Sequence, residues 1–142
     1  MMVPADDLVG WEECWSGSYK DDGPELATLY EQCSRANLML ACRETGASEF
    51  IVLAHAPRDD VFTTTSGNET HLANGVEWYR NLGAWGFAKL GDTIMAIPCD
   101  AQRGPDRLCF HVSSGSLEPG YRCGADEGAA FGDYERVILH AD

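Results

Sequence analysis

The side chains best suited to binding chemistry lie together between positions 71 and 91. Imidazole, amide, carboxylate, guanidinium and ring-bearing groups follow one another there, at His71, Asn74, Glu77, Trp78, Tyr79, Arg80 and Trp85. An exposed aromatic ring beside such polar groups can stack on a sugar ring while the polar groups hydrogen-bond its hydroxyls. We therefore predict that this cluster binds a small neutral or cationic ligand, such as a carbohydrate.

A structural role for the same aromatic residues is the competing interpretation. Large rings commonly fill the cores of β domains or form cross-strand pairs. If residues 76–80 form a strand, Trp78 and Tyr79 point to opposite faces, so alternation places at most one of them in the core. We therefore expect the other ring to be at least partly exposed.

The sequence contains none of the common catalytic motifs. It has no Gly-x-Ser-x-Gly elbow, no phosphate-binding Gly-rich loop and no His-Glu-x-x-His pair. Cys109 and His111 would share one face of a strand, but a structural Cys109 is favoured over a nucleophile. A zinc site assembled from His71, Glu77 and His111 lacks diagnostic spacing. We therefore predict no catalytic residue, no metal and no cofactor.

Six cysteines spread along the chain predict a framework of disulfides. They stand at Cys14, Cys33, Cys42, Cys99, Cys109 and Cys123. None belongs to a Cys-x-x-Cys pair, the spacing typical of metal clips and thioredoxin-like redox sites. We expect Cys14–Cys33 between the N-terminal segment and a helix, Cys99–Cys109 between neighbouring strands, and Cys42–Cys123 between distant strands.

The expected location follows from this use of cysteine, because disulfides persist in oxidising compartments. Residues 1–7 have neither the basic stretch nor the apolar stretch of a secretion signal. We therefore expect the mature part of a secreted or periplasmic protein. The alternative is a cytoplasmic protein with six reduced thiols that pack as small hydrophobic groups.

The charge balance excludes two classes of partner. Acidic residues outnumber basic ones by 23 to 10, which gives a formal net charge of −13. Such a surface repels nucleic-acid phosphates and anionic lipid headgroups, and no cluster of Lys or Arg opposes it. The apolar runs are too short to span a bilayer. We predict neither nucleic acid nor a membrane as a partner.

The periodicity of apolar residues predicts one helix followed by strands. Leu26, Leu29, Tyr30 and Cys33 follow Pro24 at helical spacing, so we expect a helix that ends near residues 35–37 and buries Cys33. The pattern then favours strands at residues 37–43, 50–56, 76–80, 84–89, 93–97, 107–112, 120–123 and 134–140.

These elements predict a mainly β (α+β) fold, an antiparallel β-sandwich or barrel-like domain with one N-terminal helix. A single domain would cover residues 1–142, with residues 1–22 irregular or extended and residues 63–70 a polar loop. The first two strands form a hairpin that we expect at the centre of its sheet, because both carry apolar side chains on both faces. His55 and His111 are expected to be half-buried within strands.

Several phrases of the chain resemble small cysteine-containing domains of bacterial proteins that have no assigned activity. The resemblance rests on residues 38–46, 56–61, 74–79 with 85–87, and 134–138. It implies no catalytic residue, because that group of domains has none assigned.

The function predicted from the sequence is that of an extracytoplasmic, disulfide-stabilised recognition module for a small molecule or glycan. One alternative is a small hydrolase whose carboxylates, or His71 with Glu77, are brought together by the fold. Another is a structural or protein-interaction domain, including a homodimer formed through the same aromatic residues. The absence of catalytic motifs favours binding over catalysis.

Overall fold

The computed structural model describes residues 3–4, 8–95, 99, 104–125 and 132–142. Over these residues the chain forms two helices, α1 (Leu26–Gln32) and α2 (Arg58–Val61). The strands are β1 (Val3–Pro4), β2 (Glu12–Ser18), β3 (Asn37–Glu44), β4 (Glu49–Phe50), β5 (Val52–Pro57), β6 (His71–Ala73), β7 (Val76–Arg80), β8 (Ala84–Lys89), β9 (Leu108–Ser113), β10 (Ser116–Cys123) and β11 (Tyr134–Ala141).

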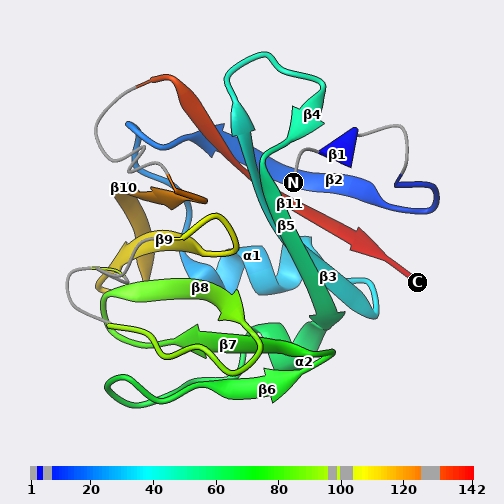
Figure 1. Ribbon diagram of the computed structural model, residues 1–142. Helices are drawn as coiled ribbons and strands as arrows, with labels where there is room; N and C mark the ends of the chain where they lie inside the picture. Colours follow the sequence, from blue (N-terminus) through cyan, green and yellow to red (C-terminus); the bar gives the residue numbers. More distant parts are fainter. Residues whose placement is uncertain (1–2, 5–7, 96–98, 100–103, 126–131) are drawn as a thin grey trace.

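Two antiparallel sheets form the body of the structure (Figure 1). A four-stranded sheet has the order β2-β11-β3-β5, and a five-stranded sheet has the order β10-β9-β8-β7-β6. The short strands β1 and β4 pair with each other. Neither sheet closes into a barrel over the described residues, so the fold is mainly β, as predicted from the sequence, and takes the sandwich form.

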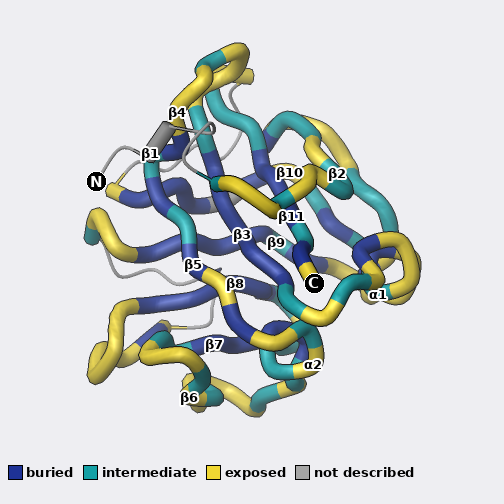
Figure 2. Tube along the Cα trace, turned by 90° about the vertical axis from the view of Figure 1, so that its right-hand side faces the viewer, coloured by how far each residue is buried: buried dark blue, intermediate teal, exposed yellow. Residues whose placement is uncertain are grey.

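The inner faces of the two sheets share one hydrophobic core. Alternate residues of β3, namely Leu38, Leu40 and Cys42, lie in this core with Trp78 and Trp85 of the five-stranded sheet. The intervening residues of β3 pack instead with β11 on the outer face of the four-stranded sheet. Burial therefore follows β3 along both faces, as Figure 2 shows in dark blue.

Helix α1 covers one end of this core, and its buried face is the one predicted. Leu26, Leu29 and Cys33 are buried, and the Cys33 amide donates to the Leu29 carbonyl at 2.8 Å to close the last turn. The start of the helix is tied to the β9–β10 turn, because the Leu26 amide donates to the Gly115 carbonyl at 2.8 Å.

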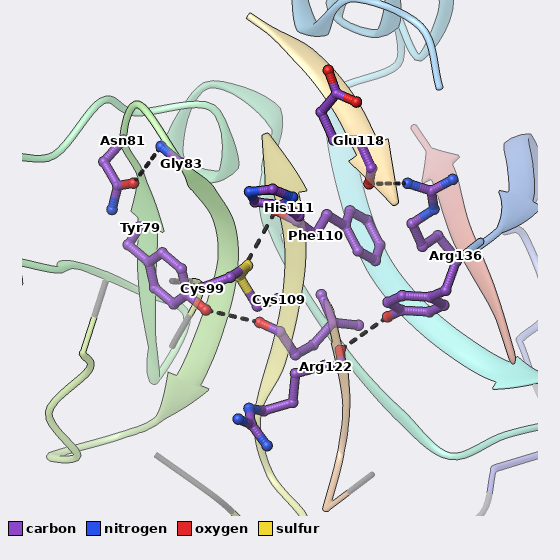
Figure 3. Close-up of a disulfide and its surroundings, with 12 residues drawn as sticks. Tyr79, Asn81, Gly83, Cys99, Cys109, Phe110, His111, Glu118, Arg122 and Arg136 are labelled. Carbon is purple, nitrogen blue, oxygen red and sulfur yellow. Dashed lines mark hydrogen bonds between the residues drawn. A yellow bond between two sulfur atoms is a disulfide. The ribbon is translucent and has the colours of Figure 1, made fainter. Parts of the chain in front are cut away.

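The middle of the outer face of the five-stranded sheet is also buried. Tyr79, Ala88 and Cys109 form a second cluster there with Ile94 and Cys99 from the chain that follows β8. The Cys99–Cys109 disulfide fixes this covering segment to β9, and Figure 3 shows Tyr79 beside the bond. Both faces of β7 are therefore shielded from solvent, which simple alternation along one strand does not predict.

The three disulfides join the pairs predicted from the sequence. Cys14–Cys33 links β2 to the end of α1, and Cys42–Cys123 links β3 of one sheet to β10 of the other. The third bond joins Cys99 to Cys109, but Cys99 lies in a turn, so the expectation of two neighbouring strands was wrong for this pair. Disulfides of this kind indicate an oxidising, extracytoplasmic environment.

Residues 12–18 form strand β2, so this part of the segment expected to be irregular or extended takes the extended form. Along β11, Ile138 faces Trp15 while Leu139 faces Glu13, so Cys14 is an extra residue in a β-bulge. The bulge breaks the alternation by which the strand could have been recognised. Residues 1–2 and 5–7 lie outside the described residues.

Two further strand predictions need correction. Strand β3 is internal, but β5 is the edge of its sheet, so the hairpin is not central as a whole. Residues 93–95 form no strand and instead belong to the segment that covers β8, while the remainder of the predicted strand, residues 96–97, lies outside the described residues. Residues 63–70 form the expected loop, without helix or strand.

The Cys42–Cys123 bond should contribute more to stability than the other two disulfides. It closes the longest sequence separation, 81 residues against 19 and 10, and a longer closed loop removes more entropy from the unfolded chain. Replacing both cysteines with Ala should lower the free energy of unfolding by about 4–5 kcal/mol, against about 3 kcal/mol for the Cys14–Cys33 pair. Denaturant titration of the two double variants measures the difference, and equal losses would contradict it.

Gly86 should be intolerant of any side chain. A Cβ placed on it would lie 2.0 Å from the Leu108 carbonyl oxygen and 2.9 Å from the Tyr79 hydroxyl. Gly86→Ala should therefore lower the free energy of unfolding by about 1–3 kcal/mol, because a close-packed interior cannot absorb the added methyl group. Gly104→Ala is the matched control, since its Cβ would meet only Arg107 atoms at 3.6 Å or more. A Gly86 variant as stable as this control would refute the argument.

Candidate functional site

The aromatic residues predicted to bind a ligand lie in the core. Trp78, Tyr79 and Trp85 are each 0% exposed. Their polar hydrogens are donated to backbone carbonyls: the Trp78 indole to Ala73 at 3.1 Å, the Trp85 indole to Val61 at 2.9 Å and the Tyr79 hydroxyl to Leu108 at 3.0 Å. The expectation that one of Trp78 and Tyr79 is exposed was wrong, and none of the three rings offers a surface to a ligand.

The polar members of the predicted cluster are separated from one another. His71 faces Trp78 in the β6–β7 register and Glu77 faces Leu72, so His71 and Glu77 lie on opposite faces of the hairpin. Glu77 accepts hydrogen bonds from the Thr70 hydroxyl at 2.8 Å and the Gly91 amide at 3.0 Å, and it thereby joins two loops. The predicted hydrolase pair of His71 and Glu77 is not assembled on one surface.

His71 and Asn74 lie at one edge of the molecule, close to strand β5. The His71 Nε2 atom is 2.7 Å from the Asp60 carboxylate. The Asn74 side-chain amide donates to the His55 carbonyl at 2.7 Å and lies 3.4 Å from His55 Nδ1. The His71 contact ties the β6–β7 hairpin to helix α2, and the Asn74 contacts tie it to β5, the edge strand of the other sheet.

An open groove surrounds His55 at this edge. It consists of two adjoining hollows of about 460 and 420 Å³, which share Asn37 and His55. We call it the His55 groove and define it by the residues that carry polar or ring groups into it: Trp11, Asn37, His55, Asp60, Asn74 and Asp142. Leu72 and Val9, which are 57% and 91% exposed, also line it.

The sheet register explains how these residues meet. Asn37 begins β3, where it lies opposite Pro57 of β5 and Ala141 of β11. His55 faces outward on β5, where buried and more exposed residues alternate, and it is exposed and not half-buried as expected. The Trp11 ring lies 5.1 Å from the His55 ring at an angle of 54°, and it packs on the outer core of the four-stranded sheet. Trp11 is half-buried, so part of its ring remains accessible.

The position of Asn74 follows from the turn that contains it. Asn74 and Gly75 have φ angles of 50° and 71°, the left-handed pair that a two-residue hairpin turn requires between Ala73 and Val76. Asn-Gly is the strongest short signal for such a hairpin. It would have revealed strand β6, which the sequence predictions missed. Trp11 was missed because no local motif marks it, and it meets His55 only in the folded structure.

Arg80 does not line the His55 groove. Its guanidinium donates to the Phe62 carbonyl at 3.0 Å, and burial lowers the pKa of this group. Arg80 lines a separate hollow of about 440 Å³ with Tyr30 and Asp59. The cluster predicted from the sequence is therefore divided among the core, the His55 groove and this second hollow.

A pair of carboxyl groups lies elsewhere, where β10 passes the loop after β2. Glu118 and Asp22 are joined by a side-chain hydrogen bond, which raises the pKa of Glu118, with further increases from desolvation and from the Asp22 charge. The charge of His111 acts in the opposite direction, and its Nδ1 lies 3.2 Å from the Pro119 carbonyl oxygen, to which it donates when Nδ1 carries the hydrogen. Because its pKa is raised, Glu118 keeps its proton to a higher pH than an ordinary glutamate does.

Asp22→Asn should bring the pKa of Glu118 back towards its ordinary range, because the hydrogen bond and charge that raise it are lost. In the wild type, the raised pKa means that the folded state binds the Glu118 carboxyl proton more tightly than the unfolded chain does. The stabilisation is therefore present at low pH and is lost as pH rises through the raised pKa of Glu118. Carboxyl carbon NMR titration measures the shift, with Asp21→Asn as the neighbouring control. An unchanged Glu118 titration in Asp22→Asn would contradict the assignment.

The described residues also bear on metal ligands and on membrane-spanning helices. No group of three or more His, Cys, Asp or Glu side chains there is arranged to hold a metal ion. None of the described helices is both long and apolar enough to cross a bilayer.

Comparisons with known proteins identify no family for this chain. No protein-family model matches the chain, and neither curated proteins nor solved structures yield a match. The resemblance to small bacterial cysteine-containing domains thus gains no support at the level of a family. The chain is a small cysteine-rich β domain with three disulfides.

Proposed function

We propose that this protein is a secreted or periplasmic recognition module that binds a small polar ligand of the carbohydrate class in the His55 groove. The observation that carries the proposal is the half-exposed Trp11 ring beside His55, with the amides of Asn37 and Asn74 lining the same groove. This site replaces the predicted platform of Trp78, Tyr79 and Trp85.

The chemistry of the groove suits a hydroxyl-rich ring. A tryptophan offers a flat apolar surface for the C–H groups of a sugar. Each Asn side chain supplies both donors and acceptors, and the Asp60 and Asp142 carboxylates add acceptors. The acidic lining also favours a neutral or cationic ligand over an anionic one.

The scaffold supports recognition because it holds the groove in a fixed shape. Asn37 lies on an internal strand, and Asn74 is fixed by its left-handed turn and by the bond to the His55 carbonyl. Rigid side chains lose little conformational entropy when a ligand binds. Such preorganisation is typical of binding sites built on disulfide-stabilised β domains.

Trp11→Ala and Asn37→Ala should each weaken binding of the recognised sugar at least tenfold, which corresponds to about 1.4 kcal/mol. A glycan array on the wild type identifies the sugar, and a titration followed by tryptophan fluorescence gives its affinity. Trp15→Ala is the control, because Trp15 is half-buried near Arg136 and does not line the groove. Thermal melts of each variant establish that the fold is retained.

Two outcomes would overturn the proposal. One is a silent array together with unchanged fluorescence in the presence of sugars. The other is concentration-dependent self-association that Leu72→Glu abolishes, because the exposed Leu72 and Val9 would then belong to a contact between two copies of the chain.

A further inference from the structure

The hollow that contains Arg80 is built on different residues from the His55 groove. It has a volume of about 440 Å³ and is lined by Leu26, Tyr30, Glu31, Asp59, Phe62 and Arg80, together with Ala27. Tyr30 and Leu26 come from α1, Asp59 from α2, and Arg80 from the end of β7. The two sites share no lining residue, so each can be tested without the other. We call this one the Arg80 hollow.

Two half-buried arginines, Arg80 and Arg58, have no acidic partner among the described residues. Arg58 lies over the Tyr30 ring and donates to the Tyr30 carbonyl, so its guanidinium is already covered, whereas Arg43 and Arg107 are paired with carboxylates. Arg43 lies 3.2 Å from Glu135, and Arg107 lies 3.5 Å from Asp92. No carboxylate of the described residues lies within 4.0 Å of the Arg80 guanidinium, which donates instead to the Phe62 carbonyl. In a protein with a net charge of −13, the Arg80 guanidinium is thus a partly buried positive charge that no carboxylate of the described residues neutralises by direct contact. A guanidinium of this kind binds a carboxylate through two parallel hydrogen bonds.

The walls of the hollow are aromatic and held in place. The Phe62 ring stacks on Trp85 with centroids 4.8 Å apart, and Tyr30 meets Phe62 edge-on at 5.0 Å. The Arg58 guanidinium lies 3.6 Å from the centre of the Tyr30 ring, and the Tyr30 hydroxyl donates to Asp59 at 2.6 Å. An apolar group can therefore pack here without rearrangement of the rings.

Negative charge also lines the hollow. Asp59 and the exposed Glu31 stand with Arg80 around the same opening. A simple anion would meet repulsion from these two carboxylates, and a simple cation would meet repulsion from Arg80. A ligand that carries both charges can place its negative group on Arg80 and its positive group near Asp59 and Glu31. An apolar side chain on the same ligand can pack against the aromatic wall.

We propose that the Arg80 hollow binds a small zwitterion of the α-amino-acid class with an apolar side chain. The ligand carboxylate lies on the Arg80 guanidinium, the ammonium group lies towards Asp59 and Glu31, and the side chain packs against Phe62 and Tyr30. This binding site is independent of the proposed sugar-binding function.

L-phenylalanine is the probe, and isothermal titration or amide NMR shifts measure its affinity. It should bind at least tenfold more tightly than 3-phenylpropanoate, which lacks the ammonium group, and than 2-phenylethylamine, which lacks the carboxylate. Equal affinity for all three compounds, or no saturable binding of L-phenylalanine, would overturn the proposal.

Matched variants test the individual contacts. Arg80→Gln should weaken L-phenylalanine binding at least tenfold, while Lys89→Gln, which removes the same charge from an exposed position, should leave it unchanged. Glu31→Gln alters an exposed side chain and should weaken binding of L-phenylalanine but not of 3-phenylpropanoate. Trp11→Ala should have no effect, which separates this site from the His55 groove. Unaltered affinity in both Arg80→Gln and Glu31→Gln would refute the assignment even if one of them were unstable.

Discussion

The Cys42–Cys123 disulfide is the constraint on which the arrangement of the two sheets depends. It joins β3, an internal strand of one sheet, to β10 at the edge of the other, and both cysteines are fully buried. Arg136 lies opposite Cys42 in the register and reinforces this corner, because its guanidinium donates to the carbonyls of Ser18, Asp21 and Glu118. At the opposite end of β3, helix α2 follows β5 (Figure 1). This helix contributes to both hollows, because Asp60 lines the His55 groove and Asp59 lines the Arg80 hollow.

The covering of the five-stranded sheet explains both why its large aromatic rings are buried and why the proposed binding sites lie where the sheets end. The segment that carries Ile94 and Cys99 covers the outer face of the five-stranded sheet, so this sheet has little exposed ring surface. Its indole and phenol hydrogens are donated to carbonyls, and the rings are therefore buried without an unsatisfied polar group. Accessible ring surface remains where the sheets end, at Trp11 in one hollow and at Tyr30 in the other.

Local patterns in the sequence predicted much of the fold. Strands 76–80 and 84–89 have the predicted bounds, and the cysteine pairs agree because a helix face and strand positions limit which thiols can meet. The burial of Tyr79 could not be predicted, since it depends on a covering segment distant in sequence from β7. The candidate sites could not be predicted either, because His55, Trp11 and Asn74 come from three segments far apart in the sequence and meet through tertiary contacts between them.

The contact between Asn74 and the His55 carbonyl has a consequence for the behaviour of the protein in solution. Strand β5 is an edge strand, and an unpaired edge is a template on which another chain can add a strand and begin to aggregate. The Asn74 side-chain amide donates to one carbonyl of that edge, that of His55. Pro57, the last residue of β5, has no amide hydrogen that an added strand could bind. The residues that shape the groove thus also hinder edge-to-edge pairing of β5 with a strand of another molecule, which favours solubility at high concentration.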